Sequence, residues 1–166
     1  MINKTAHENA SKVSGDKWNV VTDVLEISTT ESPEFIEITN QVKNIIDNSG
    51  IVEGQVLIYS THTTCSIVIN ENEQYLLADM CVFLEKIAPK DIYYRHNDFD
   101  VRTEGIRPNE SANGHSHCQQ LVLGTSETIP IVNGQMLLGE FQNIMVVEKD
   151  EPKIRKIVIQ VTGFSE

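Results

Sequence analysis

The sequence predicts an α+β fold in a single domain, with mainly antiparallel, sandwich-like β-sheets and two principal helices. Short segments alternate apolar and polar residues, two longer segments repeat apolar residues at helical spacing, and Asn133-Gly134 marks a tight hairpin. The strands group around the helices instead of alternating with them, which favours antiparallel pairing. A chain of 166 residues suits one domain. We assign residues 1–16 to a flexible polar tail and residues 17–166 to the domain.

Four strands are predicted in the first half of the chain. The segments "WNVVTDVLEIST" and "FIEIT" are rich in alternating and β-branched residues, and Ser32-Pro33 marks the turn between them. The segments "GQVLIYS" and "TTCSIVI" have the same character, and His62 lies where they join. These segments predict four strands.

Two helices are predicted from apolar spacing. In "TNQVKNIIDNSG", Val42, Ile45 and Ile46 share one helical face, Thr39 or Asn40 can serve as N-cap, and Gly50 ends the pattern. A longer helix is expected where Leu76, Met80, Phe83, Leu84 and Ile87 recur before Pro89.

The second half of the chain is predicted to be a long loop followed by strands. Residues 89–114 show little periodicity, and a loop of that length in a compact domain is usually functional or mobile. The segments that follow are apolar and β-like, and we predict strands in "HCQQLVLG", "TIPIV", "QMLLG", "NIMVVE" and "KIRKIVIQVTG".

Charge and composition exclude several classes of partner. Thirteen basic residues against twenty-four acidic ones give a net charge of −11 without a basic patch, so we expect no nucleic-acid partner. No apolar run is long enough to span a membrane, and the first 16 residues lack the apolar core of a secretory signal. Three cysteines without a CxxC pair are typical of a reducing compartment, so we expect a cytoplasmic protein.

The histidines are candidate metal ligands. If residues 115–123 form a strand, His115 and His117 point to the same face and could share a metal ion. His62 at a strand end and His96 in the long loop could supply further ligands. The alternative is that each histidine is a separate, hydrogen-bonded residue at the edge of the core.

A second group of polar residues could bind a phosphorylated ligand. Thr63 and Thr64 stand in a hydroxyl-rich run, and Asn70 and Glu71 follow the next strand. Hydroxyls and amides donate to phosphate oxygens, and a carboxylate can hold a hydrated cation. Threonine is equally ordinary in strands, and Asn-Glu-Asn is an ordinary helix entry. Glu148 and Arg155 flank a turn and could form no more than a cross-strand ion pair.

Taken together, four blocks resemble the YjbQ family, also called the secondary thiamine-phosphate synthase family. The blocks are "HTTCSIVINENE", "YRHN", "NGHSHCQQLVLGTSETIPIVNGQMLLGEFQ" and "VVEKDEPKIRKIVIQVTG", and the likeness covers roughly residues 18–163. It implies a small α+β protein with two antiparallel sheets, commonly a trimer. Phe141 and Gln119 depart from the family pattern, which often has a tryptophan at the first position and a lysine or arginine at the second.

The resemblance implies a metal-dependent thiamine-phosphate synthase-like transferase that joins a pyrimidine diphosphate to a thiazole phosphate. The alternatives are a non-catalytic metal- or anion-binding oligomeric module, or an enzyme of another reaction with incidental synthase activity. The implied cofactor is a divalent metal, zinc or magnesium, and the implied partners are a phosphorylated small molecule and two further copies of the chain. The positions that carry these roles are Glu71, Gln142, Glu148 and Arg155 for catalysis; Thr63, Thr64, Asn70 and Asn109 for substrate; and His62, His96, His115 and His117 for metal.

Overall fold

The computed structural model describes residues 17–165, which form two antiparallel sheets. The five-stranded sheet has the order β1-β8-β3-β5-β6, and the three-stranded sheet has the order β2-β7-β4. The strands are β1 (Trp18–Ser28), β2 (Glu34–Glu37), β3 (Ile51–Ser60), β4 (Cys65–Asn70), β5 (Ser126–Val132), β6 (Gln135–Met136), β7 (Asn143–Glu148) and β8 (Ile154–Ser165).

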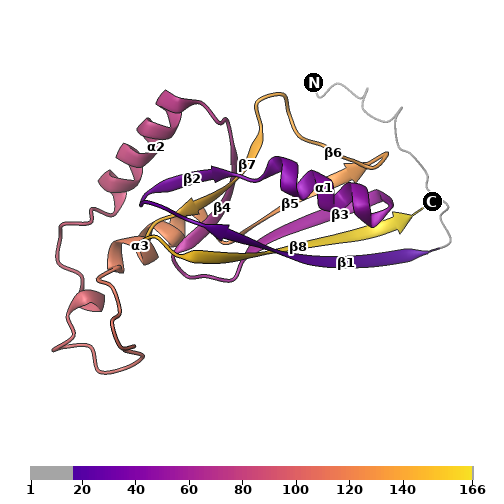
Figure 1. Ribbon diagram of the computed structural model, residues 1–166. Helices are drawn as coiled ribbons and strands as arrows, with labels where there is room; N and C mark the ends of the chain where they lie inside the picture. The colour runs from indigo at the N-terminus through magenta and orange to yellow at the C-terminus, as the bar shows by residue number, and fades with distance from the viewer. Residues whose placement is uncertain (1–16, 166) are drawn as a thin grey trace, which may run out of the picture.

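Helices lie at both ends of the sheets. Helix α1 (Thr39–Ser49) packs along the sheets at the end near the C-terminus (Figure 1). Helix α2 (Gln74–Ile87), the short 3₁₀ helix η1 (Arg95–Asn97) and helix α3 (Gly114–Leu123) gather at the opposite end, together with the long loop. No helix in residues 17–165 is long and apolar enough to cross a membrane.

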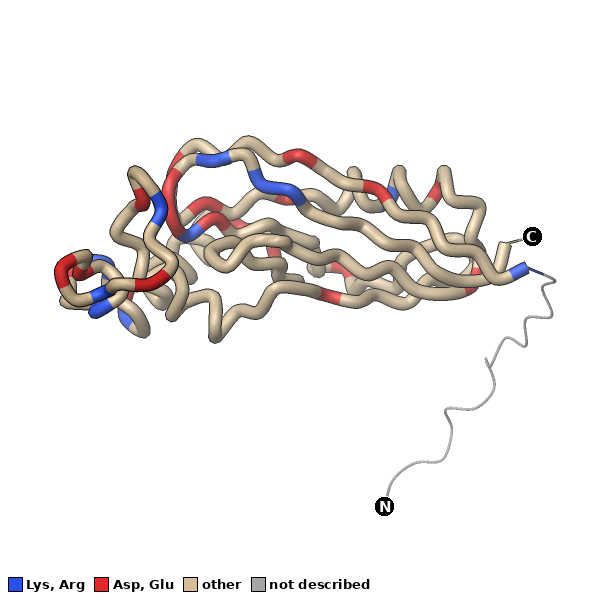
Figure 2. Tube along the Cα trace, turned by 90° about the horizontal axis from the view of Figure 1, so that it is seen from below, with Lys and Arg blue, Asp and Glu red and all other residues tan. Residues whose placement is uncertain are grey.

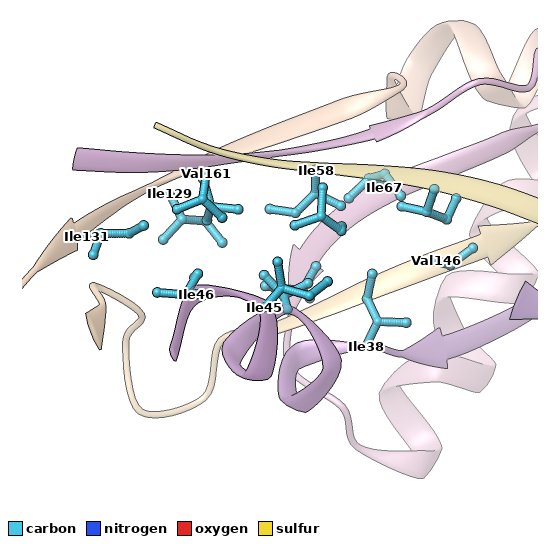
Figure 3. Packing of buried hydrophobic residues seen from close by; sticks show 14 of the residues in the cluster. Ile38, Ile45, Ile46, Ile58, Ile67, Ile129, Ile131, Val146 and Val161 are labelled. Atoms are coloured by element: carbon cyan, nitrogen blue, oxygen red, sulfur yellow. The ribbon is translucent and has the colours of Figure 1, made fainter. Parts of the chain in front are cut away.

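The hydrophobic core lies between the two sheets and α1. Helix α1 contributes Val42, Ile45 and Ile46 to it, and alternate residues of the strands point toward the same layer (Figure 3). On β8, Ile157, Ile159 and Val161 are completely buried, while the alternate residues Val158 and Gln160 are only partly buried. Full burial of one such side chain stabilises a fold by about 1.5–3 kcal/mol, so this β-branched layer holds the sheets together.

The predicted fold class is confirmed, since the described chain is a single α+β domain whose strand pairs are all antiparallel. The predicted hairpin is also confirmed. It joins β5 to β6, with Asn133 and Gly134 at φ angles of 50° and 74°. Positive φ at both positions is what a type I′ turn requires, and Asn-Gly adopts it at low cost.

The prediction of a strand at residues 115–123 was wrong, because these residues form α3. The apolar Leu121 and Val122 suggested a strand, but they are 88% and 61% exposed. The buried face of α3 is instead polar and contains Gly114, His115, Ser116, Gln119 and Gln120. A helix that buries hydrogen-bonding side chains has no apolar stripe, so apolar periodicity could not reveal it.

Two smaller expectations also differ from the structure. Neither Thr39 nor Asn40 caps α1: the N-cap position is Ile38, and Thr39 Oγ1 accepts a hydrogen bond of 2.9 Å from the Ile144 backbone N–H. The strand expected in "QMLLG" covers Gln135–Met136 alone. At α1, a contact 105 positions away in sequence occupies the hydroxyl that could have capped the helix.

Candidate functional site

Two of the predicted metal ligands form a contacting pair. His96 lies in η1 and His117 in α3, and their ring centroids are 4.7 Å apart with an interplanar angle of 68°. Burial lowers the pKa of His117, and the neighbouring His96 lowers it further. Both effects favour a neutral ring, which is the form that binds a metal ion.

The long loop folds back to hold His96 in place. Arg102 donates to both oxygens of Glu110, and its Nη1 lies 3.4 Å from His96 Nε2. A guanidinium only donates, so in this arrangement His96 Nε2 acts as the acceptor. Hydrogen bonds from Arg102 lower the pKa of Glu110.

The loop is joined to the start of α3 by Asn97 and Tyr94. Asn97 Oδ1 accepts a hydrogen bond of 2.8 Å from the Gly114 backbone N–H, one of the unpaired donors at a helix N-terminus. A Cβ atom on Gly114 would lie 2.7 Å from Tyr94 Cβ, so glycine permits the close approach. These contacts bring η1 and α3, and therefore the two histidines, together.

Asp150, which the sequence analysis missed, anchors the other end of the loop. Its carboxylate accepts hydrogen bonds from Ser111 Oγ (2.8 Å), Asn113 Nδ2 (3.0 Å) and Lys153 Nζ (2.6 Å). Asn113 Oδ1 is buried without a hydrogen-bond partner among the described residues. The acidic turn between β7 and β8 was the available signal, but the two partners of Asp150 in the loop are more than 30 positions away.

Glu148 and Arg155, predicted as catalytic, form a buried ion pair between the two sheets. Glu148 is the last residue of β7 and Arg155 is near the start of β8, and two hydrogen bonds of 2.5 Å join them. Arg155 Nη2 also donates to Thr64 Oγ1 at 3.1 Å. Glu148 is fully buried and Arg155 is 4% exposed. In this arrangement the pair fixes the connection between the sheets.

Lys149 is a second buried group that the sequence analysis missed. Its Nζ donates to Ser66 Oγ and to Gln120 Oε1, each at 2.6 Å, and neither partner carries a charge. The adjacent carboxylates of Glu148 and Asp150 bind Arg155 and Lys153 instead. Burial lowers the pKa of Lys149 to about 7.

The structure does not bring His62 or His115 to the histidine pair. His62 Nε2 accepts a hydrogen bond of 2.9 Å from the Lys156 backbone N–H. Burial lowers the pKa of His62, and the positive charge of Arg155 lowers it further. His115 and His117 do not share a strand face, because positions two apart on a helix point about 200° apart. Within residues 17–165, no three His, Cys, Asp or Glu side chains are grouped so that they could hold one metal ion.

The remaining predicted residues divide between the two ends of β4. Thr63 and Thr64 precede β4 at the end where Cys65 pairs with Glu148, which we call the histidine end. At the far end of β4, Asn70 pairs with Asn143, and this pairing brings Glu71 close to Gln142. We call this the carboxamide end. Six residues of strand separate the two ends by about 17 Å. A single chain therefore keeps these two groups apart.

The side chains at the carboxamide end already make local hydrogen bonds. Asn70 Oδ1 accepts from the Glu71 backbone N–H at 2.9 Å, and Gln142 Oε1 accepts from the Gly139 backbone N–H at 2.8 Å. The carboxylate of Glu71 is exposed. Asn109 lies apart from both ends, in the long loop, with a φ angle of 60°.

Known sequences similar to this chain share one family description. A family model described as UPF0047 protein YjbQ-like matches residues 23–164. A UPF0047 protein of Methanothermobacter thermautotrophicus is 38% identical over 87% of this chain and 93% of its own length. The UPF0047 protein YugU of Bacillus subtilis is 34% identical over 84% of this chain and 97% of its own length.

Solved structures agree with the sequence matches. A YbjQ-like protein of Sulfolobus solfataricus superposes with a TM-score of 0.80 at 31% identity, covering 89% of this chain and 99% of the other. An uncharacterised yjbq/upf0047 family protein of Clostridium acetobutylicum gives a TM-score of 0.73 at 32% identity, covering 84% and 98% of the two chains.

Proposed function

Because the chain belongs to the UPF0047 family of YjbQ-like proteins, we propose that it is a metal-dependent, thiamine-phosphate synthase-like transferase that works as a homotrimer. Its substrates would be a pyrimidine diphosphate and a thiazole phosphate. The observation that carries this proposal is the contacting pair of His96 and His117, which the long loop holds against α3.

The histidine pair fits part of a metal site. Two neutral imidazoles suit zinc better than magnesium, which prefers oxygen ligands. Zinc takes three or four protein ligands, and the described chain supplies two at this place. A donor from a neighbouring copy and a phosphate oxygen of the substrate would complete the set.

The separation of the two ends of β4 supports a site shared between copies. The carboxamide end carries the exposed carboxylate of Glu71 and the amide of Gln142, and neither can reach the histidine end of its own chain across about 17 Å. In a trimer, the carboxamide end of one copy would face the histidine end of the next. The carboxylate of Glu71 would then supply a further ligand or orient a bound water molecule.

The chemistry of such a site is substitution at the methylene carbon of the pyrimidine. The thiazole nitrogen forms a bond to that carbon as the carbon–oxygen bond breaks, and the diphosphate leaves with the bonding electrons. When bound, the divalent ion supplies charge neutralisation for the diphosphate. Thr63 would donate to phosphate oxygens, and Gln142 would position the ring of the acceptor.

A non-catalytic metal- or anion-binding module is the second candidate. Glu148 and Arg155 bond to each other in the interior, and both oxygens of Glu148 accept from Arg155. Two of the four predicted catalytic residues therefore have a structural role in this arrangement, which agrees with a function in binding alone.

The first prediction tests the histidine pair. His96→Asn and His117→Asn should each release the metal and lower product formation from the two precursors at least 100-fold. Loss of a residue that only hydrogen-bonds to a metal ligand lowers activity by up to roughly 100-fold, and loss of the ligand itself should cost at least as much. His7→Asn is the matched control, because His7 precedes the residues that the family model matches. Metal content is measured by mass spectrometry and product by chromatography.

The outcomes separate the two candidates. Metal in the wild-type protein without product would favour the binding module. Product formation that survives both substitutions at full rate would rule out the histidine pair as the centre of either function.

A further inference from the structure

A pocket of about 560 Å³, which we call the loop pocket, lies in the long loop. Its volume is within the range of small-molecule sites. Neither His96 nor His117 lines it, and none of its lining residues has a role in the proposed transferase, so the inference goes beyond that function. The lining residues are Ile92, Tyr93, Tyr94, Asn97, Asp98, Phe99 and Asp100.

Three aromatic residues form much of the lining. Tyr93 is 69% exposed and Phe99 is 44% exposed, so both offer ring surface to a ligand. Tyr94 is more buried, and its hydroxyl donates a hydrogen bond of 2.8 Å to the Pro89 carbonyl. The face of an aromatic ring carries partial negative charge and attracts a cation that comes within about 6 Å of the ring centre.

The charge of the lining is negative. Asp98 and Asp100 contribute carboxylates, and no lysine or arginine lines the pocket, although Arg95 lies nearby in sequence. The hydrogen bond from Tyr93 lowers the pKa of Asp98, so this carboxylate stays ionised. Asp100 is exposed and forms no salt bridge within residues 17–165. Carboxylates beside ring faces favour a positively charged ligand.

Hydrogen bonds hold the lining in place without a ligand. Tyr93 donates to Asp98 Oδ2 at 2.8 Å, and Asp98 Oδ1 accepts from the backbone N–H groups of Asp100 and Val101, each at 3.2 Å. Asn97 is fixed by its bond to the start of α3. A pocket that is already ordered loses less conformational entropy when a ligand binds.

We propose that the loop pocket binds a small molecule that carries a guanidinium group on an apolar stem. The planar cation lies against the rings of Tyr93 and Phe99, and its N–H edge donates to the carboxylate of Asp100. The stem packs on Ile92, which is 53% exposed. A guanidinium suits this lining better than an ammonium group does, because it stacks on aromatic faces, pairs with carboxylates through two donors and is more weakly hydrated.

The test compares ligands that share one stem. The full-length protein is titrated at fixed ionic strength with butylguanidinium, butylurea and butylammonium, and the NMR shifts of the backbone amides of residues 92–100 are followed. Butylurea has the shape of butylguanidinium without its charge. Butylguanidinium should bind saturably and about tenfold more tightly than butylurea, the combined effect of the ring contact and a charge-assisted hydrogen bond. Butylammonium should bind more weakly than butylguanidinium.

Variants at exposed positions locate the binding. Phe99→Leu keeps apolar bulk and removes the ring face, and it should weaken binding of butylguanidinium about two- to fivefold, whereas Phe99→Tyr should retain it. Asp100→Asn should weaken binding by up to about fivefold, the usual effect of losing one exposed ion pair. Asp79→Asn is the matched control: it removes an exposed carboxylate on α2, outside the pocket, and should leave binding unchanged.

Several results would overturn the proposal. The absence of saturable shifts, or equal affinity for butylguanidinium and butylurea, would show that the pocket does not recognise the cation. Equal weakening by Asp100→Asn and Asp79→Asn would show attraction to the net charge of −11 and not to this pocket. Butylammonium that bound as tightly as butylguanidinium would contradict the assignment to a guanidinium group.

Discussion

Lys149 holds its amino group in the protein interior without a carboxylate to balance it. The carboxylates on either side pair with Arg155 and Lys153, and Lys149 bonds to the neutral Ser66 and Gln120. Moving an ammonium group out of water is costly, so burial lowers its pKa from 10.5 to about 7. The amine is thus close to half protonated in the folded protein at neutral pH.

The second prediction concerns the pH dependence of stability. Between pH 7 and 10.5 the unfolded chain holds a proton on Lys149 that the folded chain has lost. The free energy of unfolding should therefore rise with pH, by up to about 1.4 kcal/mol per pH unit from this group, whereas below pH 7 both states are protonated and the slope vanishes. Lys149→Met should remove this slope.

Urea unfolding of both proteins at pH 7.5 and 9.5 measures the effect. The difference between wild type and Lys149→Met isolates this lysine from other groups that titrate in the same range. Parallel stability curves for the two proteins would show that the lysine stays charged in the folded state.

Helix α3 organises the functional end of the molecule at the scale of secondary-structure elements. Its polar face receives hydrogen bonds from Ser66 on β4 and from Lys149 after β7, and its first residue bonds to Asn97 of η1. Figure 2 shows charged residues of both signs gathered in the loop at this end. Polar bonds to α3, more than apolar packing, therefore position the loop.

The third prediction tests the bond between η1 and α3. Asn97→Ala leaves the Gly114 N–H without its acceptor, which should cost about 1 kcal/mol and loosen the loop. Hydrogen exchange in residues 90–118 should accelerate, while exchange in β3 and β8 stays slow. Asn97→Asp retains an oxygen at this position and serves as the conservative control. Equal exchange in the alanine and aspartate variants would show that another contact holds the loop.

At the scale of the whole molecule, the outer face of the five-stranded sheet carries uncharged residues at its centre. In register across the strands, Val24 of β1 lies beside Val158 of β8, which lies beside Tyr59 of β3. The charges lie toward the ends of this face, where Glu26 and Lys156 pair at 3.6 Å. A chain with a net charge of −11 repels its copies, so an uncharged surface is where they would meet most easily.

The fourth prediction is that the chain forms a trimer through this face. Val24 is 47% exposed, and Val24→Glu would place a carboxylate in each interface, so light scattering should show a fall from three copies to one. Val122→Glu is the matched control, a substitution of a 61% exposed valine on α3. A wild-type protein that is monomeric at micromolar concentrations would contradict the trimer. A trimer that survives Val24→Glu and dissociates with Val122→Glu would move the interface to α3.

The sequence by itself determined the parts of the fold that depend on apolar pattern. Alternating β-branched residues identified the long strands, Val42, Ile45 and Ile46 identified α1, and Asn133-Gly134 identified the hairpin. The motif blocks also sufficed to place the chain in its family. These features are encoded locally, because burial of one face or a positive φ angle constrains residues that are close in the chain.

Only the tertiary structure decided α3 and the partners of the polar side chains. His96 meets His117 because Asn97 bonds to Gly114, 17 positions away. The pKa of Lys149 falls to about 7 because the amine is buried, where it bonds to Ser66, 83 positions away. A histidine, lysine or carboxylate has the same letter whether it is solvated, paired or buried. Its protonation state and its role follow from long-range contacts, which a local pattern does not contain.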